Sequence, residues 1–95
     1  MSTTFKRQDD GKKGSIYILE NENPAGKIEY VWAGDDKFII EHTEVDEAYG
    51  GKGYGKSLVM EAAAMARAKN VKIIPICPYA KKVFDREESI QDVKK

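Results

Sequence analysis

The sequence predicts an α+β fold in which an antiparallel meander of strands precedes a single strand–helix–strand unit. Up to Val45, short segments rich in β-branched and aromatic residues alternate with tight turns. Beyond that point, a run rich in Ala, Leu and Met is typical of a helix, and one apolar segment follows it. Strands joined by short turns pair antiparallel, whereas strands joined through a helix pair parallel by a right-handed crossover.

The first half is expected to contain four strands, at residues 5–7, 15–19, 27–33 and 38–45, the first of them an edge strand. Turns are expected at residues 21–26, which include Asn23-Pro24, and at residues 34–37. Alternation along the third strand places Ile28, Tyr30 and Trp32 on one face, which we expect to be buried.

The second half is expected to begin with a helix over residues 56–69. A strand over residues 71–77 follows and contains Pro75. Because proline has no N–H to donate, we expect this strand to lose a ladder bond there and to separate from one neighbour. Pro78 suits the first position of a closing helix that ends near Glu87.

Composition narrows the class of protein. The 95 residues, 41% hydrophobic and 34% charged, are typical of one folded domain, expected over residues 1–95. Sixteen basic and sixteen acidic residues give a formal net charge of zero, so neither nucleic acid nor an anionic membrane is an expected partner. A single cysteine excludes an intrachain disulfide, and residues 1–14 lack the apolar stretch of a signal peptide. A cytoplasmic location is therefore expected.

The strongest chemical signal is the glycine-rich run over residues 49–58, between a strand and a helix. Its four glycines are Gly50, Gly51, Gly53 and Gly55. Glycines let backbone N–H groups approach a bulky anion, and a helix N-terminus adds positive potential. Lys52 and Lys56 would supply mobile counter-charge. We interpret the run as a cradle for a phosphate or pyrophosphate, in preference to a plain turn.

Two nucleotide-binding motifs compete for this run. Residues 50–57 satisfy the Walker A pattern. A P-loop nucleotide binder, however, needs several parallel strands and an acid that ends a strand, and the next strand ends in Ile76-Cys77. The dinucleotide fingerprint is met from neither Gly51 nor Gly53. A P-loop protein is thus the weaker alternative.

Residues 50–55 resemble the Q/R-x-x-G-x-G/A loop of the GNAT superfamily of N-acetyltransferases. With His42-Thr43-Glu44-Val45 before the loop, Cys77-Pro78-Tyr79 after the next strand, and the ending 89–93, residues 15–93 resemble a subfamily of minimal single-domain members. The resemblance implies a GNAT-like fold with a splayed parallel strand pair. It also implies a cofactor site for coenzyme A or acetyl-CoA, built by Val45, Gly50, Gly51, Lys52, Gly53, Tyr54, Gly55 and Lys56, without a metal.

The sequence departs from the superfamily pattern in three places. Gly50 stands where most members carry Gln or Arg, and no N-terminal helices precede the strands to wall the acceptor side. The tyrosine that often protonates the leaving thiolate also has no match, because Val83 and Phe84 stand there. The open acceptor side suits an exposed amine on a peptide or protein.

Acetyl transfer to an amine needs a base, because an amine with a pKa near 10.4 is neutral only about once in a few thousand molecules at pH 7. His42 and Glu41 are the candidates. As neighbours in a strand they point to opposite faces of the sheet, and His42 is expected to share its face with Phe38 and Ile40. Only one of the two can therefore face the expected cofactor cleft. The sequence leaves both open, and it also allows each to be a structural residue.

Cys77 ends a strand just before a helix, at an N-cap position where the helix dipole favours thiolate. It could carry a transient acetyl group, protonate the leaving thiolate, or only hydrogen-bond the ligand; a small buried residue is the alternative. The sequence therefore favours an acetyl-CoA-dependent N-acetyltransferase that acts on a primary amine. A module that binds coenzyme A without turnover remains the second hypothesis.

Overall fold

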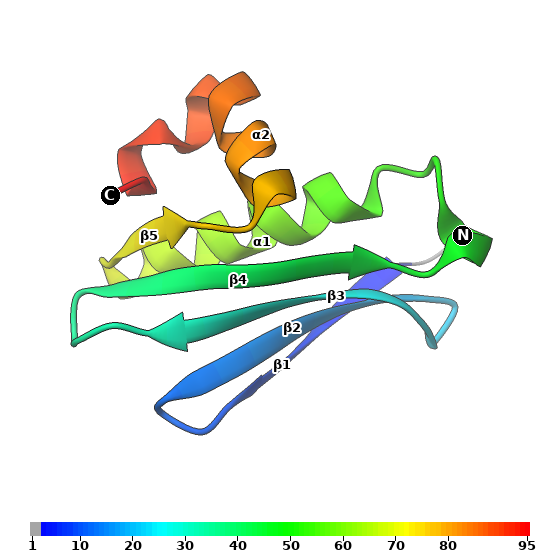
Figure 1. Ribbon diagram of the computed structural model, residues 1–95. Helices are drawn as coiled ribbons and strands as arrows, with labels where there is room; N and C mark the ends of the chain where they lie inside the picture. The colour runs from blue at the N-terminus through cyan, green and yellow to red at the C-terminus, as the bar shows by residue number, and fades with distance from the viewer. Residues whose placement is uncertain (1–2) are drawn as a thin grey trace.

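The computed structural model describes residues 3–95 and contains one mixed sheet with the strand order β1-β2-β3-β4-β5 (Figure 1). The strands are β1 (Thr3–Asp9), β2 (Lys13–Glu20), β3 (Asn23–Trp32), β4 (Lys37–Val45) and β5 (Lys72–Pro75). The first four pair antiparallel, and β5 pairs parallel with β4 after the intervening helix α1 (Tyr54–Lys69). This is the α+β arrangement that the sequence predicts.

The turn expected at residues 21–26 is shorter than predicted. It consists of Asn21 and Glu22, with φ of 49° and 72°, and β3 begins directly afterwards at Asn23. Two residues with positive φ match the right-handed twist of the flanking strands. Pro24 is tolerated inside β3 because the β2–β3 register shifts there, leaving Ala25 as an extra, buried residue.

One hydrophobic core fills the space between the sheet and α1. The sheet contributes its buried residues Ile16, Ile18, Ile28, Tyr30, Phe38 and Ile40. The α1 helix contributes Leu58, Val59, Ala62, Ala63, Met65 and Ala66. Ile28 and Tyr30 are buried as predicted, whereas Trp32 is half-buried at the margin. The Trp32 indole and the Tyr30 hydroxyl both donate to Asp9 Oδ2, at 2.8 and 2.7 Å.

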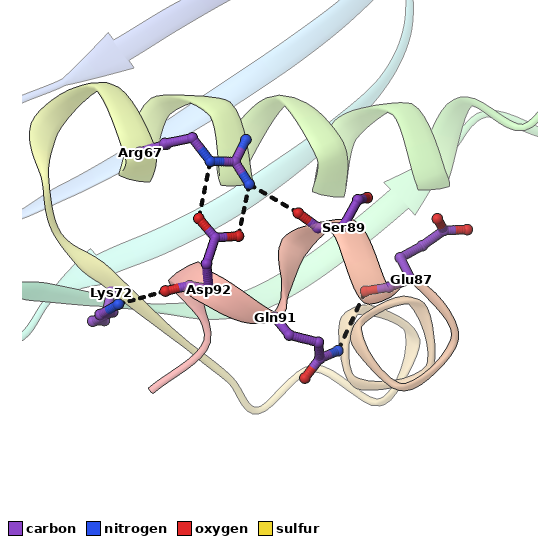
Figure 2. Close-up of polar contacts among 6 residues, drawn as sticks. All are labelled: Arg67, Lys72, Glu87, Ser89, Gln91 and Asp92. Carbon is purple, nitrogen blue, oxygen red and sulfur yellow. Dashed lines mark hydrogen bonds and ion pairs between the residues drawn. The ribbon is translucent and has the colours of Figure 1, made fainter.

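The closing helices α2 (Pro78–Arg86) and η2 (Glu88–Val93) lie on the same side of the sheet as α1 (Figure 1). Arg67 of α1 donates to both carboxylate oxygens of Asp92 and to the Ser89 carbonyl, and Lys72 donates to the Asp92 carbonyl (Figure 2). These contacts fasten the end of the chain to α1 and β5. The opposite, outer face of the sheet carries no helix from residues 3–95 (Figure 1).

None of the helices formed by residues 3–95 is both long and apolar enough to cross a membrane.

Candidate functional site

A splay between the two parallel strands opens the site. Pairing of β4 with β5 stops at Ile40 opposite Pro75, while β4 continues to Val45. The Ile76 and Cys77 amides both donate to the Ile40 carbonyl, at 3.2 and 3.1 Å, and the chain then turns into α2. The strand is shorter than the predicted 71–77, and it ends at the proline that the sequence marks as its weak point. The end of β4 thereby runs on past its parallel partner.

A groove of about 460 Å³ lies beside this end of β4. The end of β4, the glycine loop and the start of α1 and α2 line it, with Thr43, Glu44, Val45, Tyr49, Gly50, Gly51, Gly53, Tyr54, Gly55 and Tyr79. The loop follows the short helix η1 (Glu47–Tyr49) and leads into α1, which begins at Tyr54, two residues before the prediction. Most of the predicted cofactor residues therefore meet on one surface.

The loop backbone requires glycine at two positions. Gly51 and Gly53 have φ of 81° and 77°, in the left-handed region that side chains rarely adopt. A Cβ at either position would meet no atom within 4 Å, so the space above them is open. Gly53 is also the N-cap of α1, and it gives the first-turn amides no side-chain acceptor. An anion can therefore approach these backbone N–H groups.

Tyr79 of α2 lines the groove beside Gly55. A Cβ added to Gly55 would lie 2.7 Å from the Tyr79 hydroxyl, so only glycine admits the ring there without displacement. Tyr79 is nevertheless 42% exposed. Sequence reasoning did not propose Tyr79 or Thr43 as site residues. A glycine inside a helical pattern, which often marks close approach, was the available signal for Tyr79.

Both loop lysines lie in ion pairs. Lys52 Nζ is 2.6 Å from Glu20 Oε1, which also accepts a hydrogen bond from the Tyr54 hydroxyl. Lys56 Nζ is 2.8 Å from Glu87 Oε1. Hydrogen bonds from Lys52 and Tyr54 hold the pKa of Glu20 below its usual value. The predicted mobile counter-charges are thus already engaged by carboxylates.

A β-bulge in β4 decides where the candidate bases point. Tyr30 of β3 pairs with Ile40, whereas Glu29 pairs with His42, so Glu41 is the extra residue. Beyond the bulge, Thr43 faces the helices opposite buried Ile28, and His42 lies on the outer face. The expectation that His42 shares a face with Phe38 and Ile40 is therefore wrong, because the extra residue reverses the alternation.

The two candidate bases are both exposed on the outer side of β4. His42 Nε2 is 3.1 Å from Glu44 Oε2, and this contact orients the imidazole. Glu41 lies with Glu29 and Ser15 in a shallow hollow of about 380 Å³ over the sheet. The helix-side position next to the groove belongs instead to Thr43.

Cys77 lies on the helix side, with its Sγ 3.6 Å from Thr43 Oγ1. The residue is the N-cap of α2, as predicted, and it is 6% exposed. Burial raises the pKa of the thiol, but the Ala80 amide, the Thr43 hydroxyl and the Tyr79 amide outweigh burial and lower the pKa below its ordinary value. The amides act through the start of the helix, without a capping hydrogen bond to the sulfur.

The donor set suits a phosphate-bearing cofactor. Open backbone amides at a helix N-terminus match the needs of a pyrophosphate, and the two nearby lysines are each paired with a carboxylate. Among residues 3–95, no cluster of three or more His, Cys, Asp or Glu side chains has the arrangement of a metal site.

Comparison with known proteins agrees with this geometry. The model of the family described as GCN5-related N-acetyl-transferase matches residues 15–93. No curated protein sequence matches the chain. Among solved structures, a GCN5-like protein from Staphylococcus aureus is 33% identical, with a TM-score of 0.71 over 95% of this chain and 87% of that one.

Larger proteins share the fold at low identity. An acetyltransferase from Elizabethkingia anophelis with acetyl-CoA bound is 13% identical, with a TM-score of 0.67 over 77% of this chain and 63% of that one. The ribosomal-protein-S18-alanine N-acetyltransferase from Escherichia coli is also 13% identical, with a TM-score of 0.69 over 82% of this chain and 53% of that one. The chain therefore spans roughly half to two thirds of the length of these two proteins.

Proposed function

The chain belongs to the GCN5-related N-acetyltransferase family, and we propose on this basis that it binds acetyl-CoA in the groove beside β4 and transfers the acetyl group to a primary amine. The observation that supports the proposal most is the glycine loop itself. Its two left-handed glycines leave open space in front of first-turn amides, on a groove that reaches the splayed end of β4.

Different residues along the groove would bind different parts of acetyl-CoA. The amides of Gly51, Gly53 and Gly55 would hold the pyrophosphate, with Lys52 and Lys56 nearby as cations. The backbone of Val45, at the end of β4 past its last pairing with β5, would hold the pantetheine arm. When bound, acetyl-CoA would supply an activated thioester.

The two faces of β4 suggest separate roles for the candidate catalytic residues. An amine that crosses the open outer face would meet His42. Because Nε2 donates its hydrogen to Glu44 and so fixes the ring, we assign to His42 Nδ1 the proton that the amine must lose. Glu41, on the same side, is the second candidate base. Cys77 Sγ, which donates to Thr43 Oγ1 on the helix side, would give its proton to the departing thiolate and become a thiolate itself.

The absence of a helix on the outer face among residues 3–95 favours a large acceptor. A small amine would need walls to bind tightly, whereas an exposed amine on a peptide or protein brings its own surface. We therefore propose a peptide or protein amine as acceptor.

The test combines binding with turnover. Acetyl-CoA should bind in calorimetry, and a panel of peptides with free amines should yield an acetylated product detected by mass spectrometry. His42→Gln should lower kcat more than the affinity for acetyl-CoA, because His42 lies on the opposite side of β4 from the groove. Binding without any acetylated product would instead support the coenzyme A-binding module, and no binding at all would refute both.

The same mass spectra decide the role of Cys77. An adduct on Cys77 after mixing with acetyl-CoA would show a covalent acetyl-cysteine. A Cys77→Ala variant with full activity would remove this residue from the mechanism.

A further inference from the structure

Glu20 is the one buried charged residue in residues 3–95, with 9% of its surface exposed. It ends β2, far along the chain from the glycine loop, and neither the motif nor the family resemblance points to it. Burial of a carboxylate is unfavourable unless donors satisfy it. Glu20 has two such donors, Lys52 Nζ in the loop at 2.6 Å and the hydroxyl of Tyr54, the first residue of α1.

Glu20 is linked to both ends of the loop through Lys52 and Tyr54. Tyr49 ends the helix before the loop, Lys52 lies within it, and Tyr54 opens α1. The Tyr49 and Tyr54 rings lie 6.3 Å apart between centroids, and Lys52 Nζ is 5.6 Å from the centroid of the Tyr49 ring. The Glu20 carboxylate therefore binds Lys52 and Tyr54 directly, and these two residues in turn contact Tyr49 at the beginning of the loop.

The glycines themselves make little packing contact that could hold the loop. Added Cβ atoms at Gly51 and Gly53 would meet nothing within 4 Å, and the Gly53 cap lacks a side-chain hydrogen bond. Glycine also has more conformational freedom to lose than any other residue. The loop thus needs an anchor outside its glycines, and the Glu20 cluster is the contact that supplies one.

We propose that Glu20 is a positioning residue for acetyl-CoA, which holds Lys52 and Tyr54 so that the loop amides face the groove before the ligand arrives. The inference rests on the proposed function. A carboxylate so close to a pyrophosphate site also repels the ligand and neutralises Lys52. If Glu20 did only that, its removal would strengthen binding; positioning predicts the opposite sign.

The chain contains a matched control. Glu87 pairs with Lys56, in the first turn of α1, at 2.8 Å, and within residues 3–95 its carboxylate has no second hydrogen bond to the loop. Removal of the Glu87 carboxylate frees a lysine near the ligand without loosening the loop. We expect Glu87→Ala to leave acetyl-CoA affinity unchanged or to raise it.

The experiment measures the Kd of acetyl-CoA by calorimetry for the wild type, Glu20→Ala, Tyr54→Phe and Glu87→Ala. Glu20→Ala should raise Kd about tenfold, the size expected for lost hydrogen bonds to a charged group. Tyr54→Phe keeps the charges and should raise Kd about threefold through the one lost hydrogen bond. In turnover, the KM for acetyl-CoA should rise while kcat stays close to the wild-type value.

The outcomes are distinguishable. If the wild type binds and both Glu20→Ala and Tyr54→Phe bind as tightly or more tightly, the positioning role is refuted. If Glu20→Ala fails to fold by circular dichroism, Tyr54→Phe alone decides. If the wild type does not bind acetyl-CoA, the proposed function fails. The positioning of the loop is then tested without ligand, by comparing the amide NMR chemical shifts of Gly51 and Gly53 in Tyr54→Phe with those of the wild type. Unchanged shifts would refute the inference.

Discussion

Replacement of Gly55 with alanine tests the close approach of the Tyr79 ring to α1 beside the groove. The new Cβ would lie 2.7 Å from the Tyr79 hydroxyl and 2.8 and 2.9 Å from two of the ring carbons. Comfortable carbon contacts lie at about 3.5–4.0 Å, so the ring must move by roughly 1 Å. Because Tyr79 is 42% exposed, it can swing outward rather than compress the core.

The energetic effect has two opposing parts. Alanine is favoured over glycine in a helix by up to about 1 kcal/mol. Overpacking typically costs about 1–3 kcal/mol, and an exposed ring that can move avoids most of it. We therefore expect Gly55→Ala to change the free energy of unfolding by less than about 1 kcal/mol. The displaced ring should nevertheless weaken acetyl-CoA binding.

A double-mutant cycle isolates the clash. Urea unfolding is measured for the wild type, Gly55→Ala, Tyr79→Ala and the double variant. Without the Tyr79 ring, the alanine should stabilise by its full helix preference, which gives a coupling free energy of at least about 0.5 kcal/mol. Additivity within about 0.3 kcal/mol would refute the steric reasoning.

Three further predictions concern the rest of the chain. Gly14→Ala should cost about 1–3 kcal/mol by urea unfolding, because its Cβ would overlap the buried Tyr30 ring and lie 2.8 Å from a backbone carbonyl, and neither can move away; a wild-type midpoint would contradict this. The Cys77 thiolate, followed by ultraviolet absorbance, should appear at a lower pH than that of a free cysteine, since its pKa is lowered; Thr43→Val should shift the midpoint upward, and an unshifted midpoint would exclude the Thr43 contact as a cause. Asp92→Asn should lower stability slightly in dilute buffer but not in about 1 M salt, where screening acts within about 3 Å; a loss that persists in salt would show that packing, not charge, is involved.

The order and pairing of the elements could be predicted because turn residues and periodicity are local signals. The bounds were less predictable. In the turn at Asn21-Glu22, Glu22 adopts a φ of 72°, and glutamate is not a residue type that signals positive φ. The strand that follows also continues through Pro24, which the sequence suggests as a turn residue. Pro75 predicts a lost ladder bond in the last strand, but the end of the strand at Pro75 also depends on the start of α2 at Pro78.

The place of the loop could also be predicted from the sequence, since clustered glycines mark it. What surrounds the loop could not. Lys52 and Lys56 find their partners, Glu20 and Glu87, only once distant segments meet. The orientation of His42 depends on a β-bulge, and the extra residue of the bulge leaves no recognisable pattern in the amino-acid sequence. The catalytic assignments, the minimal subfamily and the cytoplasmic location remain predictions.

The bulge at Glu41 has a consequence for how this strand can change in length. The extra residue decides which face of the sheet each residue after Glu41 points to. Deletion of one residue there would move every later side chain of β4 to the opposite face. Thr43 would turn to solvent, Cys77 would lose its hydroxyl neighbour, and the imidazole of His42 would be driven among the isoleucines. The number of residues in this strand is therefore fixed by the faces on which Thr43 and His42 lie.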